Sequence, residues 1–231
     1  MTMINALIAA DEAAMLTDTL KSSAGHPSGF AHKAVLLAHI SAVLAVRGPD
    51  VHQIGATAAL DRSYLPGGIH DAAAVVARVL AAVPDWIDQN YPGERDRSRT
   101  AEAVILGWSP SLSRFVGYYV SDGRASELPA GIHCWPKSDD MPLLEPVAPA
   151  SKGIGALLTI AQVQRQALDR EDRGYVTGGE LILTHLRPQG MLTRQLHRFD
   201  DFAEVAARMP PPDPARLDRT AIRDAMGLLH V

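Results

Sequence analysis

Three residues near the start of the chain carry side chains that could work together in catalysis: Thr2, Asp18 and Lys33. They supply a hydroxyl, a carboxylate and an ammonium group, the kinds of group that nucleophilic and acid–base catalysis use. Each also has an ordinary explanation. A threonine at position 2 is usually a mere second residue, an aspartate before Thr19 is usually a turn cap, and a lysine usually faces solvent. The choice depends on the elements that carry these residues.

Residues 2–48 alternate between apolar runs and polar connections. The runs 3–10 and 13–17, joined by Asp11 and Glu12, predict a tight antiparallel hairpin whose strands are covered on both faces. The following stretch, TLKSSAGHPSG, predicts an irregular loop. The runs 33–37 and 40–46 then predict a second strand pair, which ends at Gly48 and Pro49.

The rest of the chain contains further runs of strand and helix patterns. An alanine-rich stretch at 50–60 predicts a weak helix, and the apolar spacing of 72–83 predicts a clear one, with Asp71 as its cap and Pro84 as its end. The later patterns predict strands at 102–108, 114–120 and 131–135, a helix at 151–170, a hairpin of 180–186 with 191–199, and helices at 202–209 and 218–229.

This order predicts an α+β protein, because strands and helices come in separate runs rather than in β-α-β alternation. Strands that are apolar on both faces need a cover on both. A four-layer αββα sandwich, with two stacked antiparallel sheets flanked by helices, meets that need. We expect one domain over residues 1–208, followed at 209–231 by a proline-rich connection and a C-terminal helix.

Composition limits the classes of partner and compartment. The chain has 231 residues, of which 47% are hydrophobic, so it can bury a large core. A formal charge of -4 with scattered Lys and Arg argues against nucleic acid or an anionic membrane as a partner. Cys134 is the only cysteine, which fits a reducing compartment, and the N-terminal stretch lacks the basic start of a signal peptide. We therefore expect a cytoplasmic protein.

Other candidate motifs are weaker. The sequence has no P-loop, no G-x-G-x-x-G and no H-E-x-x-H, so neither a cofactor nor a metal is expected. His133 and Cys134 are adjacent on a predicted strand and therefore point to opposite faces, which favours a core cysteine. His185 and His197 are expected to be structural, and the Asp200-Asp201 pair is expected to cap the helix that begins at Phe202.

Four stretches together resemble the proteasome β-type subunits and related bacterial peptidases, which are N-terminal nucleophile (Ntn) hydrolases. MINALIAADEAAMLTD resembles their first hairpin, and its Asp18 follows Thr2 by sixteen residues (18 minus 2). HKAVLL resembles the segment that presents their lysine, here Lys33. The other two are VILGWSPSLSRFVGYYVSDG and VTGGELILTHLRPQGM, which resemble two later hairpins. The similarity in order spans roughly Thr2 to Phe199.

The resemblance implies a threonine-type hydrolase of peptide or amide bonds that assembles into a homo-oligomeric ring. Thr2 would supply the nucleophilic hydroxyl, and its free α-amine, with an ordinary pKa of roughly 7.7 to 8.0, would take the proton. Lys33 would favour the unprotonated amine and Asp18 would hold Lys33 in place. Thr177 would support the site with its hydroxyl, and the N–H of Gly48 would stabilise the oxyanion.

The sequence also departs from the family pattern. Thr2 becomes terminal only if Met1 is removed. The position of a supporting aspartate is Gly174, with Asp172 two residues earlier, and AGIHCW lacks the expected serine. These departures favour an alternative, a catalytically silent structural or assembly protein with the same fold, for example one associated with a phage virion or tail. A small-molecule amidase is a third possibility.

Overall fold

The computed structural model describes residues 2–23, 26–90, 100–136, 153–170 and 177–210, without the side chains of 168–170. The described residues form two compact units. Residues 2–34 and 129–210 belong to the first, and residues 35–128 to the second. The predicted boundary after residue 208 stays a prediction, because the last 21 residues, 211–231, lie outside the described part.

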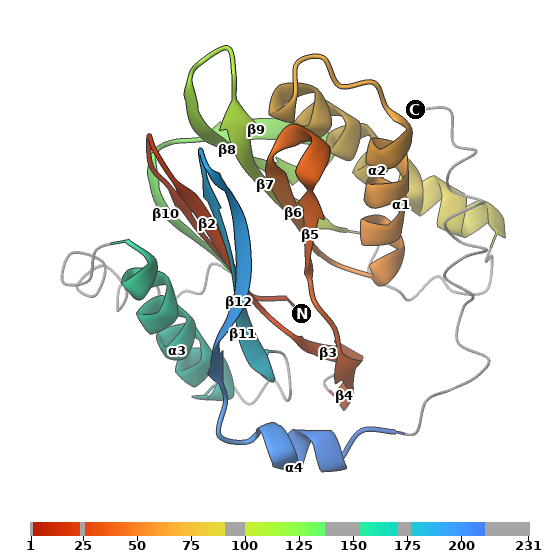
Figure 1. Ribbon diagram of the computed structural model, residues 1–231. Helices are drawn as coiled ribbons and strands as arrows, with labels where there is room; N and C mark the ends of the chain where they lie inside the picture. Colours follow the sequence, from red (N-terminus) through yellow and green to blue (C-terminus); the bar gives the residue numbers. More distant parts are fainter. Residues whose placement is uncertain (1, 24–25, 91–99, 137–152, 171–176, 211–231) are drawn as a thin grey trace. The chain divides into compact units, whose positions relative to one another are not determined.

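The first unit is built on a five-stranded sheet with the order β10-β1-β2-β11-β12 (Figure 1). Its neighbouring strands are all antiparallel. The strands are β1 (Ile4–Ile8), β2 (Ala13–Asp18), β10 (Gly131–Trp135), β11 (Glu180–Arg187) and β12 (Gly190–Arg198). The predicted first and last hairpins are confirmed, and the late-joining strand β10 pairs with β1 at the sheet edge.

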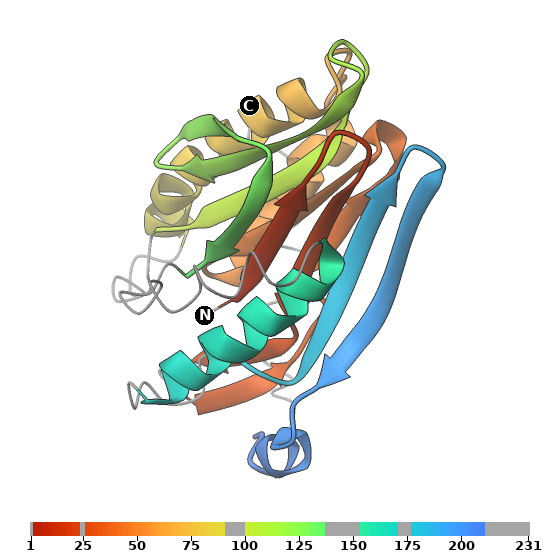
Figure 2. The ribbon, with the colours of Figure 1, turned by 90° about the vertical axis from the view of Figure 1, so that its left-hand side faces the viewer.

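Every residue of β1 and β2 is buried, as their unbroken apolar runs predict. One face of these strands packs against α3 (Ile154–Arg170), which lies across the sheet in Figure 2. The apolar side chains of this contact include Leu7, Leu16, Leu157, Ala161 and Leu183. Because these residues come from four elements, the contact fixes the sheet and the helix as one body.

The stretch predicted as an irregular loop is a two-stranded sheet, and that prediction was wrong. Its strands are β3 (Leu20–Ser23) and β4 (His26–Phe30), with a register shift between Lys21 and Ser22. The composition does not predict these two strands, because Ser, Gly and Pro, which are typical of loops, dominate the stretch. Long-range contacts stabilise the strand pair. The ring of Phe30 stacks on Phe202 of α4 (Phe202–Ala207), with ring centroids 4.6 Å apart.

The second unit contains another five-stranded sheet, with the order β5-β6-β7-β8-β9 (Figure 1). A short 3-10 helix, Ala38–Ile40, separates its first two strands. The strands are β5 (Ala34–Leu37), β6 (Ala42–Arg47), β7 (Glu102–Ser109), β8 (Arg114–Ser121) and β9 (Arg124–Leu128). The two large antiparallel sheets and their helices make the protein α+β, as predicted. The stacking of the two sheets in four layers stays a prediction.

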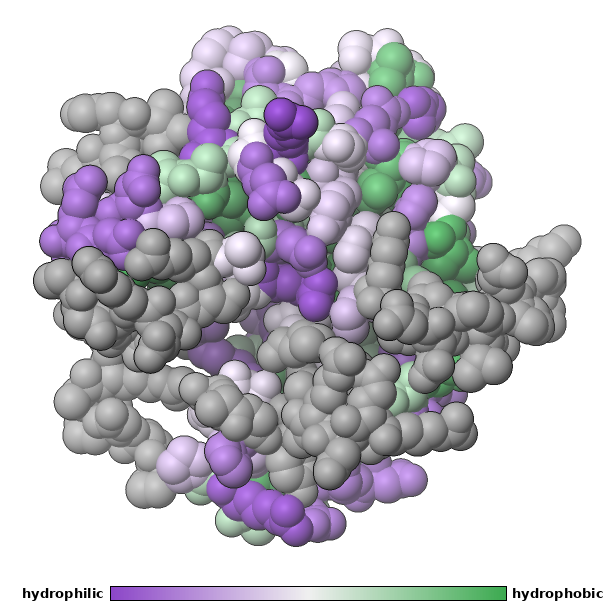
Figure 3. All heavy atoms as spheres, turned by 180° about the vertical axis from the view of Figure 1, so that it is seen from behind, coloured by the Kyte–Doolittle hydropathy of each residue, from purple (hydrophilic) through white to green (hydrophobic). Residues whose placement is uncertain are grey.

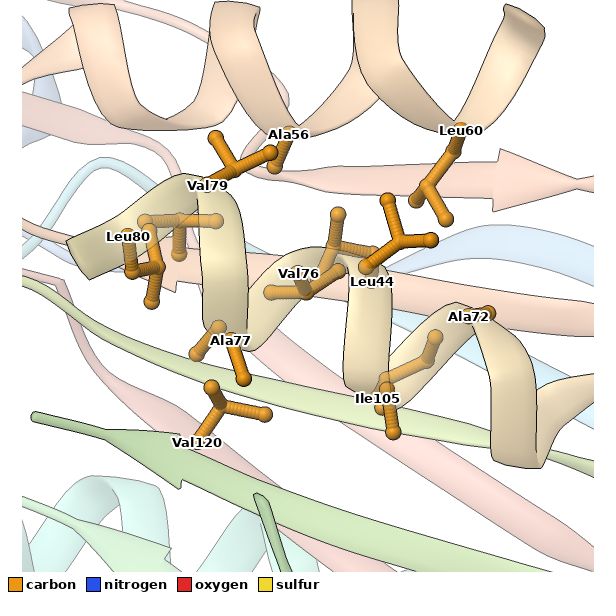
Figure 4. Packing of buried hydrophobic residues seen from close by; sticks show 14 of the residues in the cluster. Leu44, Ala56, Leu60, Ala72, Val76, Ala77, Val79, Leu80, Ile105 and Val120 are labelled. Carbon is orange, nitrogen blue, oxygen red and sulfur yellow. The ribbon is translucent and has the colours of Figure 1, made fainter. Parts of the chain in front are cut away.

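Helix α2 (Ile69–Asn90) covers the second sheet and packs against α1 (Asp50–Arg62). Figure 4 shows its apolar side chains between α1 and the sheet. Pro84 does not end the helix, contrary to the prediction, because Trp86 and Ile87 beyond it are buried in the same core. Tertiary packing thus offsets the lost N–H of the proline.

One further prediction about the second unit, that Asp71 precedes its helix as a cap, was wrong. Helix α2 begins at Ile69, so Asp71 lies within its first turn rather than before it. The Asp71 carboxylate accepts from the N–H of Gly67 at 2.6 Å. The turn at Asp122 and Gly123, both with positive φ, leads into β9, which lies outside the predicted strand ranges. Strand β9 is mostly exposed and its residues do not alternate between apolar and polar, so no sequence pattern predicts it.

A few large apolar side chains of the described residues are exposed. On the face shown in Figure 3, the hydrophobic residues among the coloured ones form small patches between hydrophilic ones. Among the large exposed side chains, Tyr64 lies in the connection between α1 and α2, whereas Leu192 lies in β12. None of the helices in the described part is long and apolar enough to cross a membrane.

Candidate active site

Asp18, the last residue of β2, is fully buried and accepts three hydrogen bonds from other described residues. Its Oδ1 accepts from Lys33 Nζ at 2.7 Å and from the backbone N–H of Met3 at 2.8 Å. Its Oδ2 accepts from the N–H of Gly178 at 3.1 Å. A buried carboxylate needs such partners, because burying it without them is very costly. Asp18 therefore joins three segments that are distant in the sequence.

Lys33 lies between β4 and β5 and is only 6% exposed. The ordinary expectation of a lysine that faces solvent does not apply here. Its ammonium group forms a buried ion pair with Asp18, and such a pair is retained in proteins when hydrogen bonds fix its geometry. The predicted pairing of Asp18 with Lys33 is thus present.

Thr2 adjoins this pair through the backbone. It is 7% exposed, and the next residue, Met3, donates its N–H to Asp18. The start of the chain is therefore held at the same carboxylate as Lys33. This geometry brings together the three residues that the sequence singles out, although the reach of the Thr2 hydroxyl toward Lys33 stays a prediction.

The turn before β11 closes the other side of Asp18. The carbonyl of Gly178 accepts from the N–H groups of Thr19 and Leu20, at 3.3 and 3.1 Å. The hydroxyl of Thr19 in turn accepts from the N–H of Glu180 at 2.9 Å. Thr177 is 1% exposed, and its hydroxyl has no hydrogen-bond partner among the described residues. A buried hydroxyl in this position can form a hydrogen bond with a group that binds at the site.

Gly179 is required by this turn. Its φ of +79° lies in the left-handed region, and a Cβ there would lie 2.5 Å from Thr19 Oγ1 and 2.8 Å from the ring of Phe30. Gly179→Ala should therefore lower the free energy of unfolding by about 2 kcal/mol or more. Urea denaturation will measure this.

The matched control for Gly179 is Gly155→Ala. Gly155 lies in the first turn of α3, and a Cβ there would meet nothing within 4 Å. This change should raise stability slightly, by up to about 1 kcal/mol, because alanine favours the helix. Equal effects of the two changes would contradict the requirement for glycine at 179.

Gly48 lies in the second unit, at the end of β6. Its φ is +140°, and a Cβ would lie 2.8 Å from the Cβ of Ala101, so close packing accounts for the glycine. Its predicted role as an oxyanion donor stays a prediction.

The contacts of the remaining candidate residues indicate structural roles. Cys134 is buried and packs near Ile160 of α3, as expected of a core cysteine. His185 Nε2 lies 2.8 Å from the carboxylate of Glu12. In the described part of the chain, no three His, Cys, Asp or Glu side chains are grouped to hold a metal. Asp172 and Gly174 lie outside the described residues.

Asp201 stands at the N-cap position of α4, which begins at Phe202 as predicted, but its side chain makes no capping hydrogen bond. Its Oδ2 instead accepts from Arg165 Nη2 at 2.8 Å. Arg165 and the backbone of Gly178 are the parts of the site that sequence reasoning missed. Neither has a local signal, because both act through contacts between distant segments.

A second polar cluster, in the other unit, centres on His70. Its Nδ1 lies 2.6 Å from the Tyr118 hydroxyl and its Nε2 lies 2.8 Å from Ser109 Oγ. Burial, and then the nearby Glu127 carboxylate, raise the pKa of Tyr118. Ser109 is fully buried and therefore closed to a substrate, so the cluster joins α2 to the β7–β8 turn.

Comparison with known proteins supports the fold. The sequence matches no protein-family model and no curated protein. The structure is similar to that of the Gly-1 mutant of Anbu from Hyphomicrobium sp. strain MC1, with a TM-score of 0.64 and 14% sequence identity. The similarity covers 90% of this chain and 92% of the Anbu chain. Anbu is a bacterial proteasome-like protein, so the chain has a proteasome-like fold.

Proposed function

We propose that this chain is a proteasome-like subunit that hydrolyses peptide or amide bonds, with Thr2 as its N-terminal nucleophile once Met1 has been removed. One observation carries the proposal. The buried pair of Asp18 and Lys33 is hydrogen-bonded to the N–H of Met3, directly beside Thr2.

The chemistry follows from a hydroxyl and an amine on the same residue. The free α-amine of Thr2 accepts the hydroxyl proton as Oγ1 attacks the substrate carbonyl carbon. The resulting ammonium returns that proton to the leaving nitrogen, and an ester to Thr2 remains. Water then attacks the ester carbonyl carbon and gives a proton to the amine. The ester C–O bond breaks, the acid product leaves, and the ammonium returns the proton to Thr2 Oγ1.

The surrounding residues have distinct roles in this scheme. The positive charge of Lys33 favours the neutral form of the nearby amine, and Asp18 holds Lys33 in place. The unpartnered hydroxyl of Thr177 is suited to support the amine, and the N–H of Gly48 to bind the oxyanion. We also propose that copies of the chain assemble into a ring in the cytoplasm.

The N-terminus provides the test. Intact-mass measurement on protein from its native host should show loss of Met1. Incubation with a peptide epoxyketone, which reacts with a hydroxyl and a free α-amine on one residue, should then add the probe mass at Thr2. Retention of Met1 on essentially all molecules would overturn the proposal, and so would a free Thr2 that the probe does not label.

A second candidate function is a silent structural or assembly protein, for example in a phage virion or tail. Strand β10 favours it, because Trp135 pairs with Ile4 at the end of the strand nearest Thr2, and Gly131–Trp135 carries no serine. The ion pair of Asp18 and Lys33 would then serve stability alone. This candidate predicts that Thr2→Ala leaves assembly unchanged and that the wild type is not labelled.

A further inference from the structure

Arg165 connects α3 to the turn that holds Asp18. It is on the helix that covers the first sheet, and its side chain is 12% exposed. One guanidinium nitrogen, Nη1, donates to the carbonyl of Thr177, and the other, Nη2, donates to Asp201 at 2.8 Å. The guanidinium carbon also lies 5.4 Å from the ring centroid of Phe199. Arg165 is therefore held on three sides.

The turn leaves space for this guanidinium group. Gly178 has a φ of +152°, and a Cβ at that position would overlap Arg165 Nη1. The same residue donates its N–H to Asp18 Oδ2. The peptide unit between Thr177 and Gly178 thus has its carbonyl fixed by Arg165 and its N–H directed at Asp18. Because a peptide unit is planar, fixing one end orients the other.

We propose that Arg165, oriented by Asp201, is a positioning residue for the candidate active site. It sets the direction of the Gly178 N–H, which holds the Asp18 carboxylate, and Asp18 in turn holds Lys33. This inference rests on the proposed function for its catalytic meaning, but its geometry can be tested without activity. Lysine is a poor substitute for Arg165, because an ammonium group lacks the planar fork that reaches both acceptors.

Hydrogen–deuterium exchange resolved to single residues tests the geometry. In the full chain, Arg165→Met should raise the exchange rate of the Gly178 amide about tenfold or more, while amides of the β2–β11 pairing, such as Leu183, change little. Arg165→Lys and Asp201→Asn should give intermediate increases at Gly178. A merely structural role would instead speed exchange at Gly178 and Leu183 together.

The matched control is Arg114→Met. Arg114 forms an exposed ion pair with Glu127 at 2.9 Å in the second unit, so its loss should leave exchange at Gly178 unchanged. If Arg165→Met does not fold, Arg165→Lys and Asp201→Asn carry the test. Unchanged exchange at Gly178 in the folded variants would overturn the positioning role.

The epoxyketone rate at Thr2 provides a second readout. Arg165→Met should lower the maximal labelling rate about tenfold or more, while the half-saturating probe concentration stays within about twofold of the wild-type value. It should also shift the acid limb of the rate–pH profile to higher pH. If the wild type is not labelled, the proposed function fails, while selective exchange at Gly178 still supports the positioning role. If labelling persists at the wild-type rate in folded Arg165→Met, the positioning role fails and the proposed function stands.

Discussion

Thr2→Ala should abolish peptide hydrolysis and epoxyketone labelling, with a loss in rate of about three orders of magnitude or more. The change removes the proposed nucleophile and leaves the α-amine, Lys33 and Asp18 in place. Thr2→Ser, which keeps a hydroxyl on the same residue, should retain part of the activity. A fluorogenic peptide assay and intact-mass analysis after labelling will measure both effects.

The control for Thr2 is another threonine of the same unit. Thr159 lies on α3, and its hydroxyl donates to the carbonyl of Gly155 one turn earlier on an exposed side of the helix. Thr159→Ala should keep the wild-type rate. Hydrolysis that persists in Thr2→Ala would place the nucleophile elsewhere and contradict the proposed mechanism.

Lys33→Met should lower the free energy of unfolding by about 3 to 5 kcal/mol, because it leaves the carboxylate of Asp18 buried without its cation. The double change Asp18→Asn with Lys33→Met should recover part of this loss, since the buried charge is then gone. Urea denaturation of the wild type, of Lys33→Met, of Asp18→Asn and of the double variant will measure the coupling between the two side chains.

An exposed ion pair is the control for Lys33. The Arg114 and Glu127 side chains are 40% and 43% exposed, and Arg114→Met should cost at most about 1 kcal/mol. A cost for Lys33→Met as small as that of Arg114→Met would show that the buried pair contributes little to stability.

The two predictions separate the candidate functions. Lys33→Met should destabilise an active subunit and a silent scaffold alike, because the cost comes from the buried carboxylate. Thr2→Ala changes a measurable rate only in an active subunit. A protein whose wild type is labelled, and whose Thr2→Ala variant is not, is therefore an Ntn hydrolase.

Local patterns predict most of the regular elements. Buried strands such as β1 and β2 are continuous apolar runs, and α2 shows the spacing of a helix with one apolar face. The failures occur where distant contacts outweigh local preference. Pro84 lies within α2 because Trp86 and Ile87 beyond it are buried, and β3 and β4 pair despite a composition typical of loops.

The candidate site likewise contains residues that the sequence indicates and residues that only distant contacts bring together. Thr2, Asp18 and Lys33 are recognisable from residue type, spacing and family resemblance, since they lie within the first 33 residues. Gly178 is 160 residues from Asp18, and only the pairing of β2 with β11 brings its N–H to the carboxylate. Arg165 reaches the same turn from α3.

The sequence alone indicates the chemical groups, the apolar strands and the α+β class, because these depend on residue type and short-range periodicity. The burial of Lys33, the three hydrogen bonds to Asp18 and the role of Arg165 depend on the tertiary structure. The physical reason is that a hydrogen bond acts over about 3 Å, whereas the groups it joins here are brought together by strand register and helix packing.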